Sequence, residues 1–217
     1  MARKPAGRER PRALEGLPDE PVESIAEDGV ADRVVVGEFP GCDLAYVEFR
    51  GCRIERTRLT GSTLAHARFI DCIVSDCDLS GVLLDECSFT RVEFRACRLS
   101  GLQAAGTRFI DVGLFESRLD GGNFGMTRWE RAEMWRCDLV DADFYGADMP
   151  GSRLLHCNLS AAVLSKCNLA GSRLSGSALE GVVGGDSLRN VAISTDQIMP
   201  AALAVFGALG IVVDDDS

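Results

Sequence analysis

The sequence predicts an all-β solenoid, in which the chain winds into stacked four-sided coils. Every fifth residue from Phe39 to Leu179 is apolar, over 29 consecutive positions. The residue two positions before each of these is small or valine, with a single leucine. A period of five fits neither an α-helix nor a β-strand. Phenylalanines at the apolar positions recur most often 20 residues apart, so four five-residue segments are expected to make one coil.

The first segment, residues 1–33, is expected to be a disordered arm. It contains four prolines and many charged side chains, but few apolar ones. A segment of this composition cannot bury enough apolar surface to offset the entropy that it loses on folding. A binding role for the arm stays open as an alternative.

Residues 34–183 are expected to form the coil. Glycines cluster two positions after the apolar residue, where a corner would need a positive φ. Because 29 pentapeptides at four to a coil make about seven coils, the stack is expected to be about 35 Å long. A ladder of stacked rings is expected inside it, formed by Phe49, Phe69, Phe89, Phe109 and Trp129.

The nine cysteines follow the repeat. In the track of small residues Cys alternates with Ala, Ser, Thr and Val, which is typical of a small buried residue. No C-x₂-C cluster of the kind that binds zinc occurs, so we expect free thiols, no metal and no cofactor. A disulfide between stacked cysteines such as Cys77 and Cys97 stays open on distance alone. The track contains all nine: Cys42, Cys52, Cys72, Cys77, Cys87, Cys97, Cys137, Cys157 and Cys167.

Residues 184–217 are expected to form a loop, a helix, a short strand and an acidic tail. Ser194 and Gln197 have the spacing of a capping box, and apolar residues follow at helical intervals. Gly210 is expected to end this helix, and Pro200 to kink or split it near Met199. Ile211 to Val213 read as the strand.

This helix has more apolar side chains than one capping face requires. A solenoid needs a cap over its last coil, and a second apolar face is expected to pair with another copy of the chain. A homodimer is therefore expected, with a cap that does not dimerise as the alternative. The expected interface consists of Ile198, Met199, Leu203, Phe206, Leu209, Ile211 and Val213.

Short stretches of the coil resemble the pentapeptide repeat family. NLSAA (158–162), NLAGS (168–172), DLVDA (138–142) and DFYGA (143–147) match its A-(D/N)-L-x-x pattern, which extends over about residues 34–183. The resemblance implies a right-handed quadrilateral β-helix and does not fix a function. The helix and strand after the coil resemble the dimerisation module of the quinolone-resistance members, the Qnr type. In that branch an acidic rod occupies the DNA site of gyrase or topoisomerase IV.

No motif for catalysis or phosphate binding is present in the sequence. His66 and His156 lie 90 residues apart and cannot share a metal or a proton. The net charge of −10 disfavours direct binding to nucleic-acid phosphates. From the composition of its first residues and the length of its apolar stretches, we expect neither a signal peptide nor a membrane-spanning segment. We expect a cytoplasmic protein that is no enzyme and has no membrane contact.

Partner binding is therefore expected on the outer faces of the coil. One outward column contains Phe115, Trp135 and Leu155, and a neighbouring column adds Ile70 and Ile110. Exposed apolar patches mark partner sites, and aromatic side chains are frequent anchors in them. Partial cover of these side chains by neighbouring arginines is the alternative.

Acidic residues are denser in the later coils, which would suit DNA mimicry. Residues 37–183 nevertheless hold 16 basic side chains with 20 acidic ones, a poor copy of the uniform field of DNA. We expect a protein-binding scaffold, with a DNA-mimicking modulator that protects gyrase or topoisomerase IV from quinolones as the alternative. An acidic stripe along one face would favour the modulator, and interleaved ion pairs the scaffold. The acidic candidates are Glu130, Glu133, Asp138, Asp141, Asp143 and Asp148.

Overall fold

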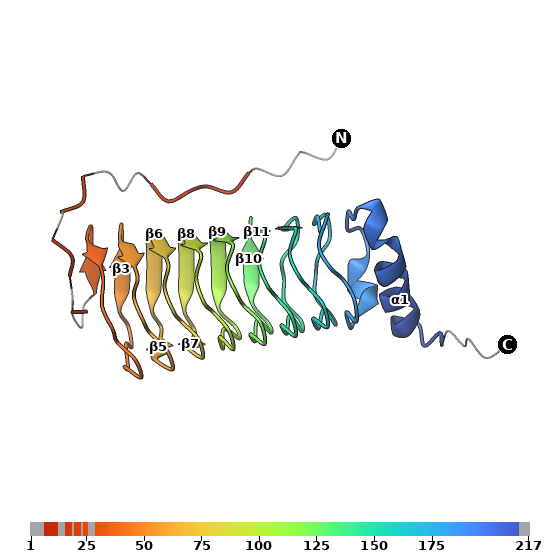
Figure 1. The fold of residues 1–217 in the computed structure, drawn as a ribbon, viewed down its shortest axis with the longest axis horizontal. Helices are drawn as coiled ribbons and strands as arrows, with labels where there is room; N and C mark the ends of the chain where they lie inside the picture. Colours follow the sequence, from red (N-terminus) through yellow and green to blue (C-terminus); the bar gives the residue numbers. More distant parts are fainter. Residues whose placement is uncertain (1–6, 13–15, 19, 23, 26–28, 213–217) are drawn as a thin grey trace.

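The computed structural model describes residues 7–12, 16–18, 20–22, 24–25 and 29–212. Figure 1 shows a rod of stacked coils with a single α-helix at its C-terminal end. The strands, in order, are β1 (Val30–Ala31), β2 (Val34–Val35), β3 (Glu48–Arg50), β4 (Arg53–Glu55), β5 (Thr63–Ala65), β6 (Arg68–Ser75), β7 (Leu83–Asp85), β8 (Ser88–Arg95), β9 (Arg108–Phe115), β10 (Arg128–Glu130), β11 (Glu133–Trp135) and β12 (Arg153–Leu155). Two 3₁₀ turns, η1 (Gly185–Leu188) and η2 (Thr195–Gln197), precede the helix α1 (Ile198–Ala208).

The expected parallel β-solenoid is confirmed. All strand pairs are parallel, and from Glu38↔Arg58 to Val163↔Val183 each pairing joins residues 20 apart. From Phe49 to Leu169 this register makes six turns of 20 residues, and incomplete turns at both ends extend the stack. A turn of 20 residues divided into five-residue segments has four sides, as expected.

Four sides of the rod can be named by their elements. The β10 side consists of β3, the first halves of β6, β8 and β9, and β10. The β11 side consists of β4, the second halves of β6, β8 and β9, and then β11 and β12. The β7 side begins with β5 and β7 and continues as isolated bridges from Gln103 to Val183. The bridge side contains only isolated bridges, from Glu38 to Ala178.

The interior is filled with stacked side chains. The rings of Phe49, Phe69, Phe89, Phe109 and Trp129 stack with successive centroid separations of 4.8, 4.7, 5.2 and 3.8 Å. Where the inward residue at one position of a segment is small, the inward residue two positions before it is large, and the reverse holds one turn later. Leu102 accompanies the small Ala104, and one turn later Gly122 accompanies Phe124. A Cβ atom on Gly122 would lie 2.7 Å from the Phe124 ring, so the large ring needs the glycine.

Corners require a left-handed backbone, and more residue types supply it than the glycines that the sequence predicted. Glycines do so at many corners, as expected from their freedom at positive φ. Charged and larger residues occupy the same position elsewhere, among them Asp71, Arg91, Asp111 and Arg131, with φ between 53° and 58°. The regular bonding of stacked coils imposes this conformation on residues that avoid it in isolation.

The described residues of the N-terminal segment are not the disordered arm that the sequence predicted. β1 pairs with β3, and Val22 forms a bridge with Val35. Further upstream, the backbone N–H groups of Glu9 and Arg12 donate hydrogen bonds to carboxylates of the coil. Figure 1 shows this segment running alongside the stack, back from the middle coils to the first one. Composition alone missed these contacts because their partners lie far away in the sequence.

The C-terminal segment covers the last coil. The side-chain amide of Gln197, which is 2% exposed, donates to the carbonyl oxygens of Leu174 and Ser177 at 2.7 and 2.5 Å. Its side-chain oxygen accepts from the backbone N–H of Ser194 at 2.8 Å, as a capping box requires. Ala201 is the buried residue of α1. The cap is therefore fixed to the coil by hydrogen bonds as well as by apolar contact.

Two details of this segment concern the expected helix and strand. The 3₁₀ turn η2 changes to α1 between Gln197 and Ile198, close to the break expected near Met199, and Pro200 lies in the first turn of α1, where a backbone N–H has no intrahelical acceptor. Ile211 and Val212 do not form the predicted strand. Gly210 takes φ 71°, and the N–H of Ile211 bonds the carbonyl of Phe206 at 2.8 Å, so this backbone ends the helix instead of pairing with a coil. Val213 and the acidic tail lie outside the described residues.

Candidate protein-binding surfaces

An aromatic column lies on the β11 side. Phe115, Trp135 and Leu155 are paired in register across β9, β11 and β12, each one residue after a buried centre of the coil. Their side chains point outward and are half-buried. The guanidinium of Arg136 lies 4.2 Å from the centroid of the Trp135 ring, and that of Arg8 lies 5.5 Å from that of Phe115. The column therefore combines outward aromatic surface with cations from two segments.

Ile70 and Ile110 do not join this column. They lie on the β10 side, one residue before the corner, and Thr90 separates them in the ladder. Both are half-buried. The corner residue Asp111, which is ion-paired, stands between Ile110 and the β11 side. The five apolar candidates are thus divided between two sides of the rod.

The acidic candidates are distributed around the rod. Glu130 and Asp148 lie on the β10 side and Glu133 on the β11 side. Asp138 lies on the bridge side and Asp143 on the β7 side. The sixth, Asp141, occupies the corner between the last two sides, with φ 56°. The structure does not bring the six together into one stripe.

Acids and arginines alternate along the corner between the β10 and β11 sides. The guanidinium of Arg91 donates two hydrogen bonds to Asp71, at 2.6 and 2.7 Å, and Arg131 binds Asp111 at the same two distances. The hydrogen bond from Arg91 lowers the pKa of Asp71, although burial opposes the shift. Interleaved ion pairs of this kind are the pattern expected of a scaffold and not of a DNA mimic.

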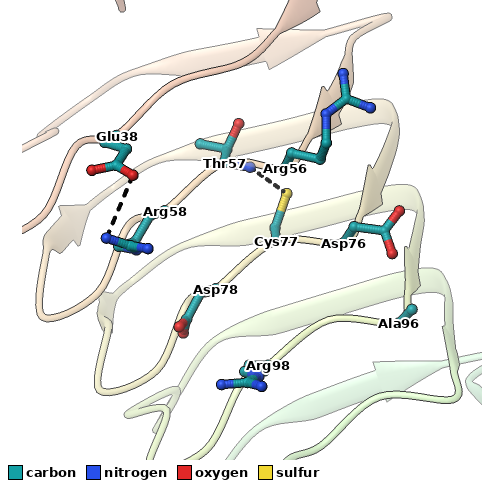
Figure 2. Close-up of a pocket in the computed structure, with 9 residues that line it drawn as sticks. All are labelled: Glu38, Arg56, Thr57, Arg58, Asp76, Cys77, Asp78, Ala96 and Arg98. Atoms are coloured by element: carbon teal, nitrogen blue, oxygen red, sulfur yellow. Dashed lines mark hydrogen bonds and ion pairs between the residues drawn. The ribbon is translucent and has the colours of Figure 1, made fainter.

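A groove at the start of the rod has the same mixed charge. Figure 2 shows its lining, in which Glu38, Arg58, Asp78 and Arg98 follow one another along the bridge side. Arg58 lies 3.5 Å from Glu38. The groove has a volume of about 390 Å³ and is open to solvent. Its lining offers both signs of charge and no cluster of catalytic groups.

The C-terminal end presents apolar side chains to solvent. Met199 and Leu209 are each 68% exposed, and Val212 is 85% exposed. α1 packs against η1, and Leu209 lines a pocket together with Leu188 of η1. All described members of the expected dimer interface are exposed to solvent: Ile198, Met199, Leu203, Phe206, Leu209 and Ile211.

Sequence reasoning missed two buried carboxylates on the coil. Glu93 and Asp111 are each 3% exposed, although both occupy outward positions of the repeat. Arg8 covers Glu93, and Arg131 with the backbone of Glu9 covers Asp111. The column Glu93–Gly113–Glu133 can be read from the 20-residue spacing, but nothing in the repeat indicates that Arg8 lies over it.

Three further findings concern the described part of the chain. It contains no group of three or more His, Cys, Asp or Glu side chains that could hold a metal ion. None of its helices has the length and apolar character needed to cross a membrane. All nine cysteines are free thiols, and only Cys42 is not buried.

Two models of protein families match the coil region of this chain. A model described as "Pentapeptide repeat region" matches residues 52–124, and one described as "Pentapeptide repeats (8 copies)" matches residues 114–154 and 137–176. Together they extend from residue 52 to residue 176. No curated protein matches the chain.

Similar chains are found among solved structures, and one of them shares the fold. A structure of trypsin-treated QnrB1, a plasmid-mediated fluoroquinolone resistance protein, is 22% identical, with a TM-score of 0.52, and the match covers 89% of this chain and 96% of that one. HetL, a pentapeptide repeat protein from the cyanobacterium Nostoc involved in regulation of heterocyst differentiation, is 18% identical. That match has a TM-score of 0.39 and covers 72% of this chain and 86% of HetL.

Proposed function

Because the chain belongs to the pentapeptide repeat family, we propose that it is a non-enzymatic scaffold that binds another protein through the outer faces of its coil. The aromatic column of the β11 side carries this proposal. Phe115, Trp135 and Leu155 point outward in register, where a coil alone has no need of large apolar side chains. Aromatic anchors next to arginines are typical of protein interfaces.

We also propose that the scaffold is a cytoplasmic homodimer, joined through the outer surface of α1. A second copy would cover side chains such as Met199, Leu203 and Leu209, which are 50–68% exposed in one chain. Contiguous exposed apolar surface of this kind favours association. Nine free thiols suit a reducing compartment.

Modulation of a type II topoisomerase by DNA mimicry is the second candidate. The fold that the chain shares with QnrB1, a protein of fluoroquinolone resistance, favours it. The charge pattern does not, because the acidic candidates lie on all four sides and arginines alternate with acids at the corner. A DNA-binding groove would meet cations of the coil as well as anions.

Two experiments separate these candidates. A photo-crosslinking side chain at position 135 is expected to capture a protein that the same group at position 103, on the β7 side, does not capture. Equal capture from both positions would contradict the role of the aromatic column. In a supercoiling assay with DNA gyrase and a quinolone, a scaffold for another partner leaves the activity of gyrase unchanged. Restored supercoiling in the presence of the drug would support DNA mimicry instead.

A further inference from the structure

Arg8 is enclosed by a socket on the β11 side. Its side chain is 6% exposed, and its Nη2 lies 2.6 Å from Oε1 of Glu93. Its Nε lies 3.8 Å from Oε2 of Glu133, two turns further along the same column. The ring of Phe115 closes the socket, with the guanidinium carbon 5.5 Å from its centroid. Two carboxylates and an aromatic face thus surround one guanidinium.

Gly113 makes the space for this guanidinium. It lies between Glu93 and Glu133 in the outward column, and its backbone does not need glycine, because its φ is not positive. A Cβ atom there would lie 2.9 Å from the guanidinium carbon of Arg8 and 2.6 Å from Cε2 of Phe115. The absence of a side chain at Gly113 therefore leaves the space that the guanidinium of Arg8 occupies.

The arm beyond Arg8 matches the rise of the coils. The N–H of Glu9 donates to Oδ1 of Asp111 at 2.9 Å, and the N–H of Arg12 donates to Oδ1 of Asp71 at 3.1 Å. Those two carboxylates lie two turns apart, about 10 Å at the usual strand spacing. An extended chain covers about 10 Å in three residues. The spacing of the two corner carboxylates thus matches the spacing of the two backbone N–H groups in an extended segment.

We propose that Glu93, Gly113, Glu133 and Phe115 form a binding site for an arginine side chain of an extended peptide, and that residues 7–12 occupy it as an intramolecular ligand. Burial of Glu93 requires a cation to compensate its charge, and Arg8 and Arg95 supply it. Arginine fits better than lysine, because a flat guanidinium can stack on Phe115 while it binds a carboxylate. The arm then covers one end of the aromatic column, a consequence that rests on the proposed function.

Amide exchange of the full chain tests whether the arm is docked. The N–H groups of Glu9 and Arg12 are expected to exchange at least about tenfold more slowly than in an unstructured peptide. Arg8→Ala is expected to remove this protection, whereas Arg10→Ala, at an exposed position, leaves it unchanged. Retained protection of Phe109 would show that the coil is intact. Unprotected amides in the unmodified chain, or protection that survives Arg8→Ala, would overturn the proposal.

A peptide with the sequence of residues 7–12, carrying a fluorophore, tests the site itself. The tethered arm competes at an effective concentration in the millimolar range, so the peptide is expected to bind Arg8→Ala at least about tenfold more tightly than the unmodified chain. Adding Gly113→Ala or Glu93→Gln to that variant is expected to remove the binding. A peptide with lysine in place of the first arginine is expected to bind several-fold more weakly.

Two results would contradict the site: equal affinity for both chains, or binding that survives both added substitutions. Neither experiment uses the unidentified partner. A negative result therefore leaves the proposed scaffold function standing, and a failed partner search leaves the arginine site standing.

Discussion

The coil and α1 differ in how far their apolar side chains are exposed to solvent. In the coil, side chains such as Phe89 and Phe109 are 2–3% exposed, because the five-residue period turns each of them inward. In α1, Met199 and Leu209 are each 68% exposed, and only Ala201 is buried. The coil therefore buries its apolar side chains within one chain, whereas the helix that covers its end leaves apolar side chains exposed.

The largest expected effect concerns that exposed surface. A dimer with a dissociation constant of about 1 μM represents about 8 kcal/mol of association free energy. Leu203→Asp puts a charge into the proposed interface and is expected to make the full chain monomeric, while Gln103→Ala on the coil leaves it dimeric. Light scattering at several concentrations measures the mass. An unmodified chain that is monomeric at micromolar concentration would contradict the contrast between the coil and α1.

The next largest effect belongs to the coil interior. Phe89 stacks between Phe69 and Phe109 at 4.7 and 5.2 Å, so Phe89→Ala leaves a cavity that the rigid ladder cannot close. We expect the free energy of unfolding to fall by about 3–5 kcal/mol. Gln103→Ala, on the outer surface, should stay within about 0.5 kcal/mol. Urea unfolding of both variants measures this, and similar losses would refute the inward and outward assignment.

Much of the coil could be predicted because the same arrangement of inward and outward side chains recurs every five residues. The apolar centres fix the inward face, and phenylalanines 20 residues apart fix the number of sides. The ring ladder from Phe49 to Trp129 followed from these two facts, and the stacked geometry confirms it. The hydrogen bond between the backbone N–H of Ser194 and the side chain of Gln197 followed from the local capping pattern.

What the sequence could not predict involves residues outside the repeat. Arg8 binds Glu93, which is 85 positions away, and no period relates the two. The strand expected at Ile211 failed for a different reason, since the backbone there bonds the end of α1. The division of Ile110 from Phe115 is of another kind, because it comes from the corner between them, which Asp111 occupies with φ 56° inside the repeat. For Arg8 and Ile211, a contact outside the repeat decided the outcome.

A smaller effect is expected at that corner. Arg91→Ala removes the two hydrogen bonds to Asp71, and we expect it to cost about 1–2 kcal/mol, between an exposed and a buried ion pair. This exceeds the loss at an ordinary surface position because Asp71 is left half-buried. A loss below that of Gln103→Ala would show that solvent screens the pair completely.

The same pair should give the coil a dependence on acid. The pKa of Asp71 is lowered in the folded chain, chiefly by the hydrogen bond from Arg91, so in acid the unfolded chain binds more protons. Its contribution is then fully present above the ordinary aspartate pKa of about 4 and is lost as the pH falls through the lowered value. Unfolding curves between pH 6 and pH 3 should be less pH-dependent for Asp71→Asn. An unchanged slope would remove Asp71 from this role.

The smallest expected effect concerns the cysteines inside the coil. Cys97 shares its column with Thr57 and Ser177, and all three bond a carbonyl of the preceding turn. The sulfur of Cys97 lies 3.4 Å from the oxygen of Val74, and the hydroxyl of Ser177 lies 2.9 Å from that of Leu154. Because serine can replace the donor, Cys97→Ser is expected to change the unfolding free energy by less than about 1 kcal/mol.

Two comparisons sharpen this last expectation. Cys97→Leu overfills the same position and is expected to cost at least about 1–3 kcal/mol. The neighbouring thiol of Cys77, together with burial, raises the pKa of the Cys97 thiol, so the reactive thiolate does not form at neutral pH. A bulky thiol reagent should therefore label Cys42, the one cysteine that is not buried, before any other. Early labelling of Cys97, or a loss on Cys97→Ser as large as on Cys97→Leu, would show that this column does more than fill the coil and bond its backbone.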